Sequence, residues 1–473
     1  MTPNPDDKIS LANAEENSRA TLARETILRQ DLADTPADTS PVSGQTKGSV
    51  ESSTGTRYGF TKIHAAGGIG RIWLARDRDL DRDVAIKELL PENAGHTKTV
   101  ARFLREARLT GQLEHPGIVP VYELATRAGT HFYAMRFVRG RTLTAAVESY
   151  HRNRIDGRDD PLEFIALLTA FAAVCNAVAY AHSRGVLHRD LKGDNVILGD
   201  FGEVIVLDWG LAKIMGQPDE LETDAVLIQN LPDNALDPGL TLQGEVVGTP
   251  AYMAPEQAEG RLHEIDQRTD VFGLGAILYE ILTGQPPFVG PNTLEVLKKA
   301  VRGSPAQPRD LWPEVPAGLE AICLKAITKD PRERYSTASD LAQEVQRWQE
   351  VQRRQAEEQY RLLADLIPGI VWTARADGWI DYANRFWFDF TGMTLEQTLG
   401  SGWAAALHPD DVDRVSRVWS KALETGELVE ISYRLRRADG VYRLFLARGK
   451  ALRDREGKVV KWFGMLTELD HVE

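Results

Sequence analysis

The spacing of apolar residues changes near Leu143, and this change limits the folds that the chain can adopt. Before Leu143, segments 71–75 and 84–87 show the alternation that is typical of half-buried strands. From there to about Trp348 the apolar residues recur at helical periods. We therefore expect a small sheet-rich lobe followed by a larger helical lobe, together spanning residues 56–350.

Three further segments surround these lobes. Residues 1–55 are rich in Ser, Thr, Asp, Asn and Pro without sustained periodicity, which predicts a disordered tail. Residues 341–367 combine apolar residues at helical spacing with a Gln/Glu/Arg-rich stretch, so we expect one amphipathic helix joining two domains. In residues 362–473, strand-like runs separated by Asp-Gly and Glu-Gly turns predict an antiparallel sheet with flanking helices. The expected fold class is α+β.

Composition excludes several classes of partner. A net charge of -13 has the wrong sign for neutralising phosphates, so we expect no nucleic-acid partner. The two cysteines, Cys175 and Cys323, lie in apolar helical patterns, which indicates buried thiols in a reducing compartment. The longest apolar stretch, Leu167–Ala181, has about fifteen residues, too few to span a bilayer. With no signal peptide visible, we expect a cytoplasmic protein without a membrane partner.

The residues best suited to chemistry follow one another in a defined order along the two lobes. Gly67, Gly68 and Gly70 lie between two strand-like segments, which suits a hairpin whose backbone closes over phosphates because no Cβ intervenes. Lys87 ends an apolar strand and needs a carboxylate partner, for which Glu106 on the next amphipathic helix is the natural candidate. Three further motifs follow, namely His188–Asn195, Asp208–Gly210 and Ala254–Glu256.

With these motifs in this order, the two lobes resemble a protein kinase, specifically the bacterial eukaryotic-like (Hanks-type) Ser/Thr kinases. The resemblance implies that Lys87 contacts the α and β phosphates of ATP while Glu106 holds it in place. It implies that Asp190 orients a substrate hydroxyl and accepts its proton, and that Lys192 neutralises the transferring γ-phosphoryl group. Lys192, together with Thr249, favours Ser/Thr over Tyr as the acceptor.

The resemblance also implies where the metal ion and the adenine ring bind. Asn195 and Asp208 offer oxygens to Mg²⁺, with Mn²⁺ as a second candidate. Met135 corresponds to the gatekeeper, and the backbone of Arg136 to Val138 would hydrogen-bond the adenine edge. The residues expected on the faces of the ring are Ile72, Ala85 and Ile197. A plain core role stays open for each of these three, because core residues follow the same alternation.

Two positions depart from the family pattern. Ala65 stands where the first glycine of the loop is expected, and Trp209 follows Asp208 where most of these kinases carry Phe. Alanine costs little unless its position needs a positive φ, and tryptophan can fill the slot of phenylalanine if the pocket is wider. Neither change removes a charge that the chemistry requires. We therefore expect an active kinase, with a pseudokinase as the alternative.

Other motif residues have structural roles by resemblance. Asp270 would brace the backbone of the catalytic loop from a helix, and Arg334 would pair with Glu256. His188 is expected to be a packed scaffold group and not a catalytic base.

The stretch 216–246 carries seven carboxylates and neither Lys nor Arg. A solvated disordered loop is the simplest interpretation. A sharper hypothesis starts from Arg189, which in such kinases commonly receives an activation-loop phosphate. Phosphorylation of Thr241 or Thr249 could then order this segment through Arg189.

The C-terminal segment resembles a PAS domain followed by its PAC segment. The resemblance rests on Ile367–Trp372, Asp377–Gly378, Tyr382–Asn384, Phe390–Met393, His408–Asp411, Tyr433–Gly440 and Trp462–Gly464. PAS domains with and without cofactors share these residues, so a ligand stays unknown. We expect His408 to start a helix and not to bind haem.

Together these features predict a Ser/Thr protein kinase that phosphorylates proteins, including itself, under the control of a PAS module. Protein substrates are the expected partners, along with a homodimer formed through the PAS domain and the connecting helix. The competing class is a non-catalytic binding module in which the kinase fold binds nucleotide only. Histidine-kinase signalling is disfavoured, because neither a phosphotransfer helix nor a second nucleotide domain is visible.

Overall fold

The computed structural model describes residues 57–215, 248–454 and 457–469. The expected N-terminal tail 1–55 and the acidic stretch 216–246, with Thr241, lie outside the described residues. The described residues form a sheet-rich lobe, a helical lobe and a C-terminal domain, as the change of hydrophobic pattern predicts.

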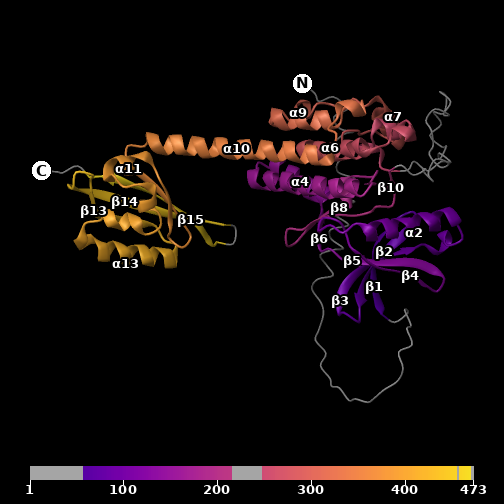
Figure 1. Cartoon of the computed structure of the whole chain (residues 1–473), viewed down its shortest axis with the longest axis horizontal. Coiled ribbons are helices and arrows are strands. Elements are labelled where there is room, and N and C mark those ends of the chain that lie inside the picture. The colour runs from indigo at the N-terminus through magenta and orange to yellow at the C-terminus, as the bar shows by residue number, and fades with distance from the viewer. Residues whose placement is uncertain (1–56, 216–247, 455–456, 470–473) are drawn as a thin grey trace, which may run out of the picture. The chain divides into compact units, whose positions relative to one another are not determined.

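The first lobe is a five-stranded antiparallel sheet in the order β1-β2-β3-β5-β4 (Figure 1). Its elements are β1 (Tyr58–Ala66), β2 (Gly70–Asp77), β3 (Arg82–Leu89), α2 (Thr97–Gln112), β4 (Val121–Arg127) and β5 (Thr130–Arg136). Alternation along β3 divides its side chains between two cores. Val84 and Ile86 join one cluster, whereas Ala85 and Leu89 join the cluster that contains Phe103 of α2. The same alternation places Lys87 on the face that α2 covers.

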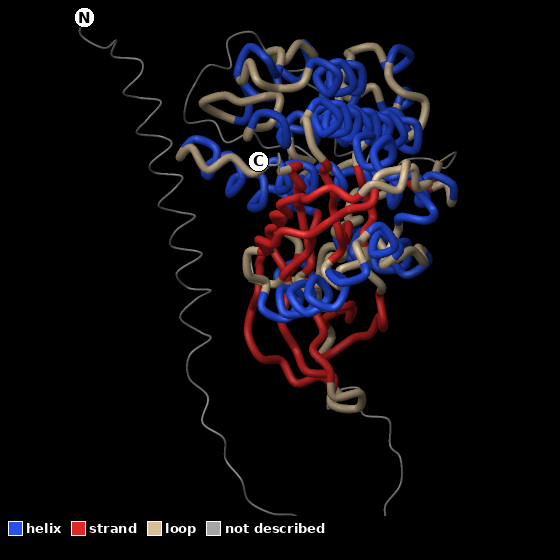
Figure 2. Tube along the Cα trace, turned by 90° about the vertical axis from the view of Figure 1, so that its left-hand side faces the viewer, coloured by secondary structure: helices blue, strands red, loops and turns tan. Residues whose placement is uncertain are grey.

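The second lobe is mainly helical, and Figure 2 shows its helices in blue. Its helices are α3 (Leu143–Ile155), α4 (Pro161–Ser183), α5 (Pro255–Ala258), α6 (Gln267–Thr283), α7 (Thr293–Arg302), α8 (Pro308–Leu311) and α9 (Ala317–Ala326). Its short strands are β6 (Gly140–Thr142), β7 (Val186–Leu187), β8 (Val196–Gly199), β9 (Val204–Val206) and β10 (Lys213–Ile214), which form the sheets β6-β8-β9 and β10-β7.

Helix α6 is the centre of this lobe. It begins after Asp266, whose carboxylate caps the N-terminus by accepting the Arg268 N–H, and it ends at Gly284 in the left-handed conformation that favours glycine. Every residue from Thr269 to Thr283 is buried. A Cβ at Gly275 would lie 2.7 Å from the Cβ of Ala326, so glycine is what lets α9 pack closely against α6.

Helix α4 corrects one expectation from the sequence. It is 23 residues long and, among the described residues, is the one helix long and apolar enough by length and composition to cross a membrane. The stretch Leu167–Ala181 is only the middle of this helix, which begins at Pro161 after its Asp160 cap and continues to Ser183. Within the fold α4 packs against α6 and α10 (Ala338–Leu366), and 56% of its most apolar window is buried. Cys175 of α4 and Cys323 of α9 are buried free thiols, as predicted.

The C-terminal domain is a second five-stranded antiparallel sheet, in the order β12-β11-β15-β14-β13. Its elements are β11 (Ile370–Arg375), β12 (Ile380–Ala383), α11 (Arg385–Thr391), α12 (Leu395–Thr398), α13 (Pro409–Thr425), β13 (Val429–Arg436), β14 (Tyr442–Arg453) and β15 (Val459–Glu468). Trp387 and Phe390 of α11 and Val415 of α13 pack against the sheet and build one core with it. This is the sheet with flanking helices that the strand-like runs predict.

An apolar cavity of about 60 Å³ lies inside this domain. Its lining includes Trp372, Trp387, Trp419 and Tyr433 and contains no charged side chain. The volume corresponds to about two water molecules. His408 does not line the cavity. It precedes α13 and accepts the Asp410 N–H at 3.3 Å, so it starts a helix as expected.

One helix, α10 (Ala338–Leu366), connects the helical lobe to the C-terminal domain. It begins three residues before the predicted start at 341, because Thr337 and Asp340 form a capping box. Leu341 and Val345 are buried in the core of the helical lobe. At the other end, the Ala364 carbonyl accepts the Asn384 amide at 2.9 Å. Between these contacts, residues 351–363 are exposed and include ion pairs such as Arg353 with Glu357 at 2.6 Å.

A buried ion pair ties the end of the helical lobe to its middle. Arg334 donates to both oxygens of Glu256 at 2.8 Å, and neither side chain is exposed to solvent. The other guanidinium N–H groups donate to the carbonyls of Thr328, Arg268 and Lys329 at 2.7 to 3.0 Å. All five N–H donors of arginine are therefore used. The pairing that the sequence resemblance implied is confirmed.

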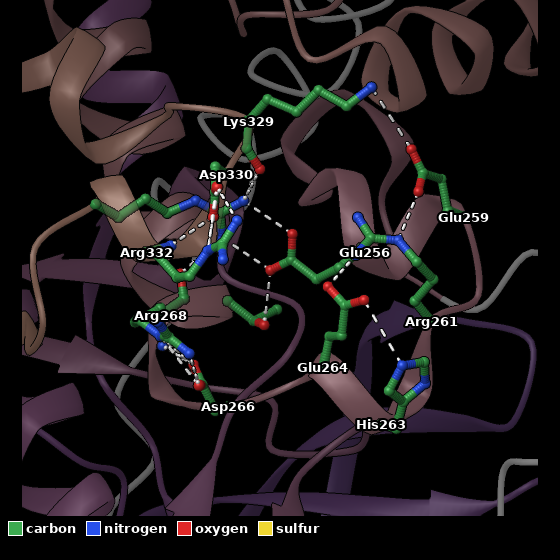
Figure 3. A network of polar contacts seen from close by, with 12 residues as sticks. Glu256, Glu259, Arg261, His263, Glu264, Asp266, Arg268, Lys329, Asp330 and Arg332 are labelled. Atoms are coloured by element: carbon green, nitrogen blue, oxygen red, sulfur yellow. Dashed lines mark hydrogen bonds and ion pairs between the residues drawn. The ribbon is translucent and has the colours of Figure 1, made fainter.

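Figure 3 shows that Glu256 is surrounded by surface ion pairs. Arg332 pairs with Asp330 at 2.7 Å, and the Arg332 side chain is 82% exposed. Arg261 contacts both Glu259 and Glu264. Exposed pairs contribute little to stability because water screens them, so Glu256 and Arg334 dominate this network.

We expect Arg334→Met to lower the free energy of unfolding by about 3–5 kcal/mol, because it leaves the Glu256 carboxylate buried without its partner. Urea denaturation followed by circular dichroism measures the change. Arg332→Met is the matched control, and we expect no measurable change from it. Equal losses in the two variants would show that the buried pair has no special role.

Candidate active site

The charged residues predicted from the motifs meet where the two lobes face each other. Lys87 Nζ lies 2.5 Å from Glu106 Oε1 and 3.3 Å from Asp208 Oδ1. Glu106 is buried on the inner face of α2, and its Oε1 also accepts the Tyr133 hydroxyl at 2.6 Å. On the same helix, Arg102 donates to the Gly210 carbonyl at 3.0 Å, so α2 contacts both Lys87 and the segment that carries Asp208.

Electrostatics keep both ends of this contact charged. Burial alone works to lower the pKa of Lys87, but the negative charges around it, including those of Glu106 and Asp208, raise that pKa well above its ordinary value. Burial works to raise the pKa of Asp208, but the charge of Lys87, its hydrogen bond to Asp208 and the charges of other neighbours together outweigh burial, so the pKa is lowered. At neutral pH the site therefore presents an ammonium and a carboxylate side by side.

The catalytic loop is held by one carboxylate of α6. Asp270 accepts the backbone N–H groups of His188 and Arg189, each at 2.8 Å, and its Oδ2 lies 2.7 Å from His182 Nε2. Burial works to raise the pKa of Asp270, but the hydrogen bond to His182 and the charges around it lower that pKa. Arg189 has a φ of +71°, a conformation that a non-glycine residue keeps only when its surroundings hold it. Asp270 has the bracing position that the resemblance implied.

Asp190 is oriented by the segment that precedes Ala254. The Thr249 N–H donates to Asp190 Oδ1 at 2.9 Å, and Lys192 Nζ lies 3.4 Å from Asp190 Oδ2. Lys192 also donates to the Thr249 hydroxyl at 2.8 Å. The Thr249 hydroxyl thus contacts the catalytic residues, and a phosphate on it would face the Asp190 carboxylate. This geometry favours Thr249 as a positioning residue over Thr249 as a phosphate acceptor.

Asn195 and Asp208 fit the role of ligands for a hard cation. The Asn195 amide nitrogen donates to the Asp190 carbonyl at 3.0 Å, so its oxygen is the atom left for a metal ion. Asp208 uses Oδ1 for Lys87, and its backbone is left-handed, with a φ of +56°. An amide oxygen, a carboxylate and phosphate oxygens are the kind of ligand set that Mg²⁺ takes.

The residues expected around adenine are brought together with one exception. Ala85 and Met135 are buried in the same cluster, against which Ile72 and Val138 pack. Ile197 of β8 is half-buried and does not belong to that cluster, so its place on the ring face stays a prediction. Arg136 follows Met135 at the end of β5, and its backbone N–H donates to the Pro120 carbonyl at 3.1 Å.

Both departures from the family pattern are accommodated. Ala65 lies in β1 opposite Ile72 and does not have a positive φ, so it needs no glycine. Trp209 is buried, and its ring lies 4.6 Å from that of His188. His188 is itself buried, with Nε2 3.1 Å from the Leu207 carbonyl oxygen. It is a packed scaffold group, as expected.

Sequence reasoning missed several residues that hold the site. Tyr133 on Glu106, His182 on Asp270 and Gln257, which donates to the Arg189 carbonyl at 2.9 Å, were not singled out. Tyr133 and His182 lie in apolar patterns that look like ordinary core. The feature that could have identified Tyr133 and His182 is the polar group at the end of each side chain, because a buried polar group needs a hydrogen-bond partner.

Glu280 of α6 lies beneath the catalytic loop and is buried. A Cβ at Gly193 would lie 2.3 Å from the Thr144 hydroxyl and 2.9 Å from Glu280 Oε2, so only glycine lets the loop pass there. Burial raises the pKa of Glu280 to about 7, although the nearby Thr144 and Tyr252 hydroxyls act in the opposite direction.

Comparison with known proteins follows the same division of the chain. Residues 61–347 match the protein kinase domain family, and residues 380–466 match the PAS fold family. The serine/threonine-protein kinase PknD of Protochlamydia amoebophila (strain UWE25) is 38% identical over 301 residues, which cover 62% of this chain and 30% of that protein. The protein of the same name from Chlamydia pneumoniae is 35% identical over 292 residues, or 61% of this chain and 31% of that protein. The chain thus spans about a third of the length of these relatives.

We expect Glu280→Gln to raise the melting temperature at pH 8.5 but not at pH 5. Between the ordinary pKa of 4.5 and about 7, the unfolded chain releases a proton that the folded carboxyl keeps, so stability falls as the pH rises. Glutamine does not ionise and avoids this loss. Circular-dichroism melts at both pH values measure the difference, with the exposed Glu92→Gln as control. The same difference in melting temperature at both pH values would contradict the interpretation.

Proposed function

The chain belongs to the protein kinase family, and on this premise we propose that it transfers the γ-phosphoryl group of ATP to Ser or Thr hydroxyls of proteins, its own chain included. The observation that carries the proposal is the contact of Lys87 with both Glu106 and Asp208. This contact joins strand β3, helix α2 and the segment that carries Asp208 into one charged site. Positioning and charge stabilisation are the main sources of rate in phosphoryl transfer.

Each side chain has one task in this reaction. The Asp190 carboxylate, oriented by the Thr249 N–H, accepts a hydrogen bond from the substrate hydroxyl and takes its proton. The hydroxyl oxygen bonds to the γ-phosphorus as the bond to the β–γ bridging oxygen breaks, leaving ADP. Lys192 lies beside Asp190 and offsets the charge of the transferring group. Asn195 and Asp208 would hold a Mg²⁺ ion, which would neutralise charge on the phosphate oxygens.

Activation through the acidic stretch belongs to the same proposal. We propose Thr241 as the residue that accepts the phosphate. The alternative, Thr249, is less suited because its hydroxyl contacts Lys192. A phosphate on Thr241 would pair with Arg189, whose backbone is fixed by Asp270 and Gln257. The expected cytoplasmic location stays a prediction.

We further propose that the PAS domain controls the kinase through a dimer formed at the end of α10. The last turns of this helix expose large apolar side chains, with Leu362 66%, Leu363 65% and Leu366 79% exposed. The preceding turns are polar and self-paired, for example Arg354 with Glu350 at 2.8 Å. Apolar side chains gathered at one end of an otherwise polar helix favour association with a second copy.

The activity is tested with the full chain, γ-labelled ATP and Mg²⁺. We expect label in the unchanged protein and a loss of about 100-fold or more in Asp190→Asn, because the base is removed while the loop geometry is kept. Asp200→Asn, at an exposed turn between β8 and β9, is the matched control and should keep full activity. Binding of ADP without label in any variant would favour the non-catalytic binding module instead.

Sedimentation velocity tests the dimer. The unchanged chain should sediment as a dimer, and the double variant Leu362→Glu with Leu366→Glu as a monomer, because each charge would have to be buried in the interface. Ile155→Glu is the control, since Ile155 is 70% exposed on the helical lobe. A monomeric unchanged chain would reject the dimer and leave the phosphoryl transfer untouched.

A further inference from the structure

The glycine-rich hairpin is held from outside by hydrogen bonds from the segment that follows β3. After β3, the central strand of the sheet, the chain makes a short 3-10 turn, Pro91–Asn93. The Asn93 Nδ2 group donates to the carbonyls of Gly68 and Ile69, at 3.0 and 3.2 Å. The Ile69 carbonyl also accepts the backbone N–H of Leu90 at 3.0 Å. Two consecutive carbonyls of the hairpin therefore point at the same side chain.

This arrangement also sets where the N–H groups of the hairpin point. In a trans peptide the C=O and the following N–H lie on opposite sides of the chain. Because the carbonyls of Gly68 and Ile69 face Asn93, the N–H groups of Ile69 and Gly70 face away from it. The bond that closes the hairpin uses the Gly67 N–H and the Gly70 carbonyl, 2.9 Å apart, and leaves those two N–H groups out. Successive N–H groups on one side of the backbone form an anion-binding concavity.

The contacts of the neighbouring residues show what holds each part of the hairpin in this conformation. A Cβ at Gly70 would lie 2.7 Å from the Glu88 carbonyl oxygen, so only glycine lets the hairpin lie this close to β3. The Ile69 side chain packs against the cluster that contains Leu89 and Phe103. In contrast, a Cβ at Gly68 would meet no atom within 4 Å. Packing therefore holds Ile69 and Gly70. Among these contacts, only the hydrogen bond from the Asn93 amide holds the Gly68 carbonyl.

We propose that Asn93 is a positioning residue for nucleotide phosphates: its side-chain amide fixes the peptide groups that aim the Ile69 and Gly70 N–H groups at a phosphate oxygen. Asparagine suits this role because Nδ2 carries two N–H donors, one for each carbonyl. The inference rests on the proposed function in taking a nucleoside di- or triphosphate as the ligand. It adds a residue outside the glycine-rich hairpin itself.

Asn93→Asp tests the proposal, because aspartate keeps the shape but replaces the donor by a carboxylate oxygen, which cannot donate to either carbonyl. Calorimetric titration of the full chain measures the affinity for two ligands. One is ADP in the presence of Mg²⁺, and the other is adenosine, which has no phosphate. We expect ADP to bind about 3- to 10-fold more weakly, the range of one or two lost hydrogen bonds, with adenosine binding unchanged. Asn93→Ala should behave like Asn93→Asp. Glu92→Gln, at the exposed neighbouring position, should leave both ligands unchanged.

The outcomes separate the possible failures. Unchanged ADP affinity in Asn93→Asp would overturn the positioning role, and so would an equal weakening of ADP and adenosine, because that would indicate general damage to the lobe. Melting temperatures of each variant show whether the fold is retained. In steady-state assays the KM for ATP should rise while kcat stays within about twofold, since Asn93 touches no reacting atom. Because ADP binding is measured without phosphoryl transfer, a chain that binds ADP but transfers nothing would reject the proposed activity and leave the role of Asn93 in place.

Discussion

The Asp270 carboxylate is the contact on which the geometry of the active site most depends. It accepts two consecutive backbone N–H groups, those of His188 and Arg189, and so fixes the peptide planes immediately before Asp190. Its own position is set by α6, a helix buried along nearly its whole length. A displacement of α6 would therefore move the Asp190 carboxylate, although Asp270 and Asp190 share no direct hydrogen bond. Asp270 can stay ionised in this core because three hydrogen bonds, to His182 and to the backbone N–H groups of His188 and Arg189, offset the cost of its desolvation.

The other half of the site depends on two independent periodicities. Alternation along β3 points Lys87 towards α2, and the helical repeat of α2 buries Glu106 while Arg102 contacts Gly210. A shift of one residue in either element would separate the ammonium from the carboxylate. The charges come from distant parts of the sequence, but each lies on an element whose register is fixed by apolar packing. Hydrophobic burial thus decides the electrostatics of the site.

Much of this could be predicted from sequence, and the remainder could not for identifiable reasons. Lys87, Glu106 and Asp208 were predictable because motif order, alternation and charge all agree. Tyr133 was not, because a buried tyrosine on an alternating strand looks like ordinary core until its hydroxyl is seen on Glu106. The contact of Thr249 with Asp190 joins residues 59 positions apart and depends on a loop path that local patterns do not define. Helix α4 is longer than its apolar stretch because Glu163 and His182, the polar residues on either side of that stretch, do not end the helix.

The left-handed backbone at Arg189 and Asp208 carries a consequence for how this chain can change. Neither residue is glycine, and a side chain in that conformation costs about 1–2 kcal/mol that glycine would avoid. Selection for stability alone would therefore favour glycine at both positions and remove the carboxylate at one of them. At Asp208 the side chain that bears this cost is the proposed metal ligand, so part of the stability of the fold is given up there for chemistry. Thermostable variants obtained without an activity screen should accordingly gather substitutions at such positions, and stability and turnover would then move in opposite directions.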